Sequence, residues 1–306
     1  MIQYLVRRSI NETFQKVATP PANSVWVIGS KITKIELIEI ADSYDLDINI
    51  LRDVLDKHEL PRVESNKSGL YVFIRSAHRS SNGDLITVPL LLAIKGSIFL
   101  SLSTNDNSSK FNFLLNKVDK HSTTSSLLLT ILATVVSDYE QLIQNTATYI
   151  NDIDRRLRTH EVTNADFIQF VSIDANLNEY HMNLTNMLVV AERLRDMTKS
   201  SVDRELIGDI TLHIRQNLAA SERYNQNVNS IRSTYSTIAN NNLNKRMKIL
   251  TVLTVLITLP NVFYGMYGMN IILPFQDQPW AYQIIVGFTL LLILLVYLLA
   301  RRFKVL

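Results

Sequence analysis

Hydroxyl and carboxamide side chains recur at steps of three and four residues in the last quarter of the sequence, along a largely uncharged stretch. This spacing keeps one face of a helix toward a common axis when helices supercoil. A closed ring of identical chains would turn each such residue into a ring of side chains. Rings of neutral oxygens suit a divalent cation that keeps its water, as Mg²⁺ does. The series is Asn240, Asn244, Met247, Thr251, Thr254, Thr258, Asn261, Gly265 and Gly268.

Two alternatives for this series stay open. The small residues could only pack the helix against a neighbour, or a threonine hydroxyl could bond the backbone of its own helix. Met247 and Leu250, near the start of the uncharged stretch, would form apolar rings that close a path by expelling water.

Two uncharged segments are long enough to cross a membrane. They cover residues 249–276 and 280–300, and about 20 residues cross a hydrocarbon layer about 30 Å thick. Basic residues flank both segments at the ends away from the connecting loop, and the only charged residue of that loop is Asp277. This distribution predicts a multi-pass protein of the cell membrane with both termini in the cytoplasm. The flanking residues are Lys245, Arg246, Lys248, Arg301, Arg302 and Lys304.

Composition argues against several other classes. The formal net charge of +3 over 306 residues is too small to favour a nucleic-acid partner, and without cysteine there are neither disulfides nor thiolate metal sites. The N-terminal residues do not resemble a signal peptide. No nucleotide-binding loop, metalloprotease motif or nucleophile elbow occurs, and the six histidines stand far apart. We therefore expect no enzyme, no catalytic residue and no resident cofactor.

The elements that carry the series divide the chain into six parts. Residues 1–110 mix strand-like and helix-like runs and predict a cytoplasmic α/β domain, with a hairpin turn at Ser81-Asn82-Gly83-Asp84. Residues 111–201 predict a cytoplasmic helical hairpin. Residues 202–268 predict a stalk helix that continues into the first transmembrane helix. An outer loop (269–280), a second transmembrane helix (281–300) and a basic cytoplasmic tail (301–306) follow. The fold class is an α+β membrane protein.

Two stretches resemble the CorA family of divalent-cation transporters. "NKRMKILTVLTVLITLPNVFYGMYGMN", residues 244–270, is similar to the family's first transmembrane helix, with its Gly-Met-Asn signature at Gly268, Met269 and Asn270 after Tyr267. "HELPRVE", residues 58–64, is similar to a stretch of the family's cytoplasmic domain. The resemblance implies a homopentameric funnel in the lipid bilayer, with a ring of first transmembrane helices around the pore.

The resemblance also implies roles for individual residues. Gly268, Met269 and Asn270 would form the selectivity filter, with the Asn270 amide oxygen contacting a hydrated ion. Gly268 would make room near the axis and allow the turn out of the helix. The pore face would consist of Asn244, Met247, Leu250, Thr251, Thr254, Thr258, Asn261 and Gly265.

The family is thought to close when cytoplasmic Mg²⁺ occupies acidic sites between subunits. Asp209 and His213 are four residues apart on one helix face and could contribute such a regulatory metal site, with Asp84 of the next chain as a partner. The alternative, that all three are solvated surface residues, stays open.

The transported ion is expected to be Mg²⁺. The absence of cysteine and of histidine along the series argues against a site for softer metals, which favour nitrogen and sulfur donors. Transport of Zn²⁺, as by the relative ZntB, or of Co²⁺ or Ni²⁺ is the alternative, with proton coupling as one mechanism. A rival from another class is a membrane-anchored sensor or scaffold that transports nothing.

Overall fold

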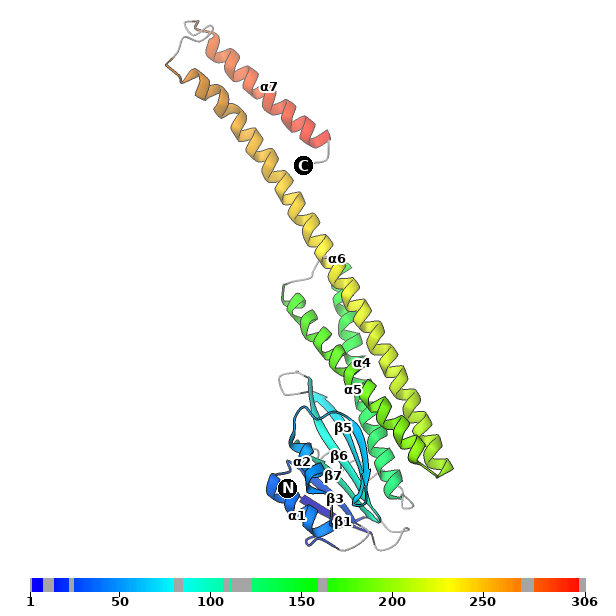
Figure 1. Cartoon of the computed structure of the whole chain (residues 1–306). Coiled ribbons are helices and arrows are strands. Elements are labelled where there is room, and N and C mark those ends of the chain that lie inside the picture. Colours follow the sequence, from blue (N-terminus) through cyan, green and yellow to red (C-terminus); the bar gives the residue numbers. More distant parts are fainter. Residues whose placement is uncertain are drawn as a thin grey trace. The chain divides into compact units, whose positions relative to one another are not determined.

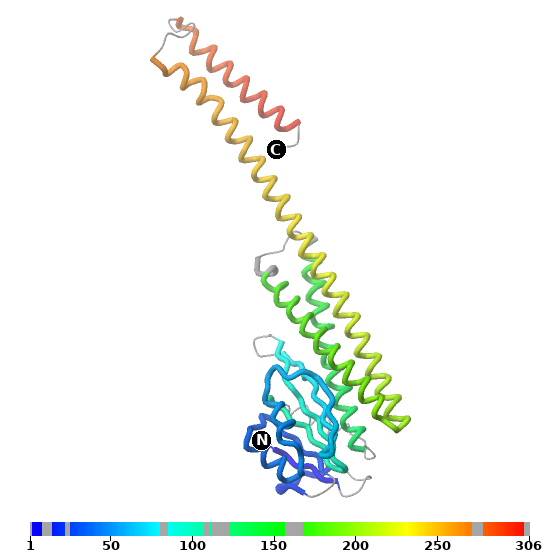
Figure 2. Tube along the Cα trace, viewed as in Figure 1, coloured from blue at the N-terminus to red at the C-terminus, as the bar shows by residue number. Residues whose placement is uncertain are grey.

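The structure is a computed structural model that describes residues 2–7, 14–21, 25–79, 85–106, 111, 123–158, 164–270 and 278–302. The chain divides into two compact units, Met1–Asn229 and Ser230–Leu306. Figure 1 labels the helices and strands of both units, and Figure 2 follows the same chain as a Cα trace.

The first unit contains a seven-stranded sheet with the strand order β2-β1-β3-β7-β6-β5-β4 (Figure 1). All neighbouring strands are antiparallel except β3 and β7, which pair in parallel. The predicted turn Ser81–Asp84 lies between β5 and β6, outside the described residues. The strands are β1 (Ile2–Val6), β2 (Gln15–Val17), β3 (Val25–Ser30), β4 (Arg62–Asn66), β5 (Gly69–Arg79), β6 (Leu85–Lys95) and β7 (Ile98–Ser103).

Helices cover both faces of this sheet. On one face, α1 (Lys34–Tyr44), α2 (Ile48–Arg52) and the 3-10 helix η1 (Asp53–Leu55) pack on a core that contains Leu37, Leu51 and Phe73. Successive residues of a strand point to opposite faces of the sheet, so each strand can bury side chains on both faces. On the other face, α4 (Thr124–Arg158) contacts β5 and β6. Burial on both faces explains why β3 is apolar and buried at nearly every position.

Local signals in the sequence set the ends of α1. Thr33 accepts a hydrogen bond from the Glu36 N–H, and the Glu36 carboxylate accepts one from the Thr33 N–H, which forms a capping box. The helix stops at Asp45, whose φ of 50° is left-handed. Lys95 of β6 forms an ion pair with the Asp45 carboxylate at 2.8 Å, which lowers the pKa of Asp45.

Three long helices pack side by side in the first unit, as Figures 1 and 2 show: α4, α5 (Asn164–Met197) and the N-terminal part of α6 (Ser201–Tyr267). The Asn217 carboxamide of α6 donates to the Val136 carbonyl of α4 at 3.3 Å, and the Ser221 hydroxyl donates to the Leu177 carbonyl of α5 at 3.0 Å. Because these side chains are buried, their hydrogen bonds fix the register of the three helices.

The second unit contains the rest of α6 and the helix α7 (Ala281–Arg302), which lies beside it (Figure 1). The Phe263 ring of α6 meets the Phe288 ring of α7 edge to face, with 5.4 Å between their centroids. On α7, Ala281, Thr289 and Ala300 are buried. α6 remains one helix through Pro260, the position where the sequence allows a kink.

Among the described residues, α4, α6 and α7 are long and apolar enough to cross a membrane. The fold itself buries 56% of the apolar window of α4, but 0% of that of α6 and 11% of that of α7. The apolar side chains of α4 therefore serve the core of the first unit. Those of α6 and α7 are left for lipid or another chain to cover, as expected of the two transmembrane helices.

Candidate ion pathway

One face of α6 in the second unit packs toward α7. Val252, Leu256 and Phe263 are half-buried there, although most residues of this part of α6 are exposed. At 3.6 residues per turn these three positions lie within about 40° of one another around the helix. They therefore define the side on which α7 lies.

The opposite side carries the series of polar and small residues, which we call the seam. At 3.6 residues per turn, the mean direction of its members between residues 247 and 265 lies about 180° around the helix axis from the face toward α7. Every member is exposed in the single chain. The seam consists of Asn244, Met247, Leu250, Thr251, Thr254, Thr258, Asn261 and Gly265.

The three threonines of the seam share one hydrogen-bonding arrangement. Thr251 donates to the Met247 carbonyl at 2.9 Å, Thr254 to the Leu250 carbonyl at 2.8 Å, and Thr258 to the Thr254 carbonyl at 2.7 Å. This is the alternative in which a threonine bonds its own helix. Each hydroxyl proton is thereby used inside the helix, but the oxygen keeps a lone pair that can accept a further hydrogen bond.

Asn261 differs from the threonines. Within the part of the chain that the structure describes, its exposed carboxamide has no hydrogen-bond partner. An unpaired amide in an apolar medium costs ~2–7 kcal/mol. A residue near the end of a transmembrane helix therefore needs water or another chain at this position.

The seam ends in a turn that contains the Gly-Met-Asn tripeptide. The Gly268 N–H donates to the carbonyls of Tyr264 and Gly265 at 3.0 and 3.2 Å, and the Met269 N–H donates to the Met266 carbonyl at 3.2 Å. Gly268, Met269 and Asn270 are all exposed.

Neither glycine of this region is required by the single chain. A Cβ on Gly268 would lie 3.4 Å from the Tyr264 carbonyl oxygen, and one on Gly265 would meet nothing within 4 Å. Neither residue has a positive φ, unlike Gly69 and Gly96. Among the described residues, neither a positive φ nor a close contact therefore requires glycine at residue 265 or 268.

The proposed regulatory residues are only partly described. Asp209 and His213 are both exposed on the first unit's part of α6, one turn apart. Asp84 lies outside the described residues. Among the residues the structure describes, no three metal-ligating side chains come together. A metal site at Asp209 and His213 would therefore need ligands from elsewhere.

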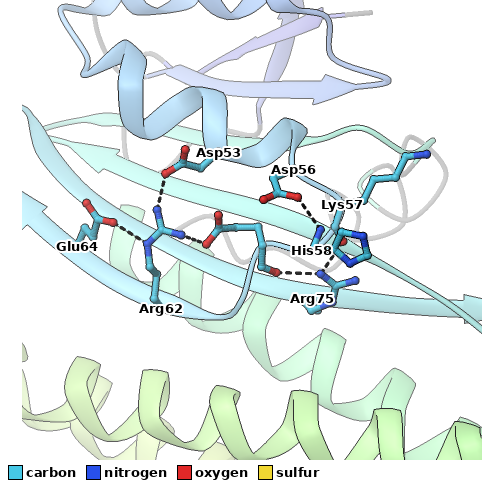
Figure 3. A network of polar contacts seen from close by, with 8 residues as sticks. Asp53, Asp56, Lys57, His58, Arg62, Glu64 and Arg75 are labelled. Carbon is cyan, nitrogen blue, oxygen red and sulfur yellow. Dashed lines mark hydrogen bonds and ion pairs between the residues drawn. The ribbon is translucent and has the colours of Figure 1, made fainter.

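The stretch "HELPRVE" contributes to a charged network around Arg62, which the sequence did not predict (Figure 3). Arg62 forms ion pairs with Asp53 and Glu64, both at 2.6 Å, and with Glu59. Its guanidinium also lies 4.3 Å from the centroid of the Phe73 ring. One guanidinium thus forms ion pairs with three neighbouring carboxylates.

Arg75, in the same view, ties the sheet to the loop before β4 (Figure 3). Its guanidinium is buried and donates to the Lys57 carbonyl at 2.9 Å and the Glu59 carbonyl at 2.8 Å. It also donates to the Thr87 hydroxyl oxygen at 2.8 Å, and this hydroxyl donates to Glu179 of α5 at 2.7 Å. Sheet and helices are thereby joined by a continuous polar network.

One of the comparisons with known proteins identifies a family. The family model described as "CorA-like Mg2+ transporter protein" matches residues 22–302. A sequence comparison with curated proteins finds no match.

Solved structures share the fold. The CorA magnesium transporter of Methanocaldococcus jannaschii has a TM-score of 0.86 at 19% identity, covering 99% of this chain and 98% of its own. The full-length CmaX protein has a TM-score of 0.74 at 17% identity, covering 98% and 97%. The ZntB cytoplasmic domain of Vibrio parahaemolyticus has a TM-score of 0.64 at 9% identity, covering 78% and 98%. These likenesses confirm the fold predicted from the sequence. By the family model, the chain belongs to the CorA-like Mg²⁺ transporter family.

Proposed function

We propose that five copies of this chain enclose a pore for hydrated divalent cations, with Mg²⁺ as the main cargo, across the cell membrane. The membership of the chain in a family of divalent-cation transporters supports cation movement as the activity. The observation that carries the proposal is the seam, an exposed line on the side of α6 that faces away from α7, whose threonine and asparagine side chains are neutral acceptors.

The seam matches what a hydrated cation presents. Water bound to a cation points its hydrogens outward, so a lining for the hydrated ion must accept hydrogen bonds. The threonines have already donated their own protons to the helix backbone and therefore offer only lone pairs. Asn261 offers an amide oxygen that has no partner within the described chain. Mg²⁺ gives up its water reluctantly, so it fits this lining well.

A lipid-facing role does not account for the same residues. The apolar side chains of Leu253, Val255 and Ile257 are exposed on the flanks of the seam and suit lipid or neighbouring helices. Asn261 in hydrocarbon would remain unpaired, at a cost that a water-filled axis removes. No contact or positive φ among the described residues requires Gly265 or Gly268, and a crowded axis would give both a role.

The two ends of the path have different proposed tasks. Asn270, with Gly268 and Met269, forms the outer filter and contacts the hydrated ion through its amide oxygen. Met247 and Leu250 form apolar rings near the cytoplasmic end and close the path by dewetting. Asp209 and His213, together with Asp84, bind a cytoplasmic divalent cation that favours the closed state.

The decisive experiment is divalent flux into proteoliposomes under an inside-negative potential, with Mg²⁺, Co²⁺ and Zn²⁺ compared and internal pH recorded. Asn270→Ala should abolish selective Mg²⁺ entry while light scattering in detergent still gives a pentamer. Gln278→Ala removes an exposed carboxamide from the same outer region and serves as the matched control. Selective Mg²⁺ entry through Asn270→Ala at the wild-type rate would refute the filter. Zn²⁺ entry with protons would refute Mg²⁺ as the main cargo, and no flux with a smaller oligomer would favour the anchored sensor.

A further inference from the structure

Basic residues of α6 and α7 lie at the same level in the second unit. The rings of Phe263 and Phe288 meet, with 5.4 Å between their centroids, and α7 runs back along α6 from this contact (Figure 1). Lys248 precedes Phe263 by 15 residues, and Arg302 follows Phe288 by 14 residues. At a rise of 1.5 Å per residue, both therefore lie ~20 Å from the ring contact, at the same end of the helix pair.

No acidic side chain of the described second unit accompanies these charges. Its described residues include Lys and Arg but neither Asp nor Glu. In the sequence, the only acidic residue after Glu222 is Asp277, in the loop that joins the two helices. Like charges this close repel one another, so an anion bound at this end would stabilise it. The basic residues, all exposed, are Lys245, Arg246, Lys248, Arg301 and Arg302.

The two arginines of α7 lie on the same side of the helix as a stripe of exposed leucines. Thr289 and Ala300 are buried and mark the covered side of α7. At 3.6 residues per turn, Arg301 and Arg302 each point more than about 100° away from that side. The leucines that precede them on this open side are 62%, 57% and 51% exposed: Leu291, Leu294 and Leu298. Charged groups and apolar surface thus follow one another along one side of α7.

This order matches the order of groups in a phospholipid. A guanidinium presents a planar fork of N–H donors that matches phosphate oxygens. The leucines, farther from the end of α7, offer an apolar surface to an acyl chain, from which a free phosphate ion would gain nothing. Lys245 and Lys248 add positive charge at the level of the arginines, which favours a lipid with net negative charge.

We propose that this end of α7 binds an anionic phospholipid such as phosphatidylglycerol. Arg301 and Arg302 bind the phosphate, and the leucine stripe contacts an acyl chain. A zwitterionic lipid binds less well, because the described second unit offers no carboxylate to its choline group. The site depends on the membrane insertion of both helices but not on an ion path. Since the lipid binds the folded helix pair, its binding stabilises that pair.

The test is lipid binding to the full-length protein in neutral detergent, counted by native mass spectrometry. The probes are phosphatidylglycerol, phosphatidylcholine with the same acyl chains, and glycerol phosphate, which has no acyl chain. Phosphatidylglycerol should bind at least about 10-fold more tightly than either of the other two. Arg301→Gln combined with Arg302→Gln should weaken its binding about 30-fold, since each basic residue near an anionic lipid surface contributes about five-fold.

The matched control combines Arg193→Gln with Arg232→Gln, which removes two exposed arginines outside this end of α7. It should bind phosphatidylglycerol like the wild type, and the same spectra should give the wild-type oligomer mass for both double variants. Equal affinity for the two lipids, or equal loss of binding in both double variants, would overturn the proposal. Unchanged binding by the Arg301 and Arg302 variant would do so too. Glycerol phosphate that binds as tightly as phosphatidylglycerol would indicate a site for a free anion and would also overturn it. None of these readouts is ion flux, so the result is independent of the pore proposal.

Discussion

Thr258→Val tests the seam with a nearly isosteric change. The substitution removes one hydroxyl, which in the structure donates to the Thr254 carbonyl at 2.7 Å and is exposed on the side away from α7. Thr289 of α7 provides a close control, because it also donates to the backbone one turn earlier, at 2.7 Å to Ile285, but is buried. Thr289→Val therefore makes the same chemical change away from the seam.

The size of the effect follows from the number of acceptors that a passing ion loses. In a pentamer, Thr258→Val removes a ring of hydroxyl oxygens at once. A hydrogen bond is worth about 0.5–1.5 kcal/mol net, and a hydrated ion that touches two oxygens of the ring would lose ~1–3 kcal/mol. The barrier for permeation then rises by this amount, and flux falls about 5- to 150-fold. The fold loses only a hydrogen bond within its own helix, so the oligomer should persist.

The assay is Mg²⁺ entry into proteoliposomes, followed with an internal Mg²⁺ indicator at equal protein content. We expect Mg²⁺ entry to be about 5- to 150-fold slower for Thr258→Val and to keep the wild-type rate for Thr289→Val. Both variants should have the oligomer mass of the wild type in detergent. If Thr258→Val transports at the wild-type rate, the hydroxyl does not face the ion, and the reasoning from helix geometry fails. If both variants slow transport equally, the effect belongs to helix packing and not to the seam.

Two further predictions concern the first unit. Arg75→Met removes the donors that bind the Lys57 and Glu59 carbonyls, and loss of one partner of a buried charged network costs ~3–5 kcal/mol. Urea unfolding, monitored by the fluorescence of the buried Trp26, should show this loss of stability. An unchanged urea midpoint would mean that the network does not stabilise the fold. Lys95→Met should make the stability of the fold less sensitive to acid. The hydrogen bond and the charge of Lys95 lower the pKa of Asp45 in the folded state. The pair therefore stabilises the fold fully above the unfolded pKa of about 4, and this stabilisation is lost as the pH falls through the folded pKa. Thermal unfolding from pH 6 to pH 3 measures it, and parallel curves for wild type and variant would contradict the assignment.

The two transmembrane helices and the seam could be predicted because each depends on local sequence. The absence of charge over residues 249–276 and 280–300 marks the spans, and a 3.6-residue period decides which side of α6 a residue occupies. Hydropathy and length alone would have added α4 as a third span. Only the fold shows that its apolar residues, such as Leu132 and Val135, are covered by the first unit.

The sheet order and the polar sites could not be predicted in this way. β3 and β7 pair in parallel although some seventy residues separate Trp26 from Phe99, and no local pattern specifies such a pairing. The network of Arg75 reaches Glu179 through Thr87, and a cavity of the first unit is lined by Arg79 together with residues of α4 and α5. A single sequence carries no signal for contacts over these distances. The glycine at residue 268 was predicted to allow the turn, yet the turn forms without a positive φ.

The hydrogen bonds of the seam threonines also determine how protons behave beside the ion. Proton hopping along hydroxyl groups requires each hydroxyl to accept one proton, release another and then rotate back. Thr251, Thr254 and Thr258 each hold their proton against a backbone carbonyl, so rotation would break a hydrogen bond of 2.7 to 2.9 Å at every step. In the proposed pore, the helix wall would thus supply acceptors to a hydrated ion without supplying a chain of hydroxyls for proton transfer, and a proton that crossed would have to use the water alone.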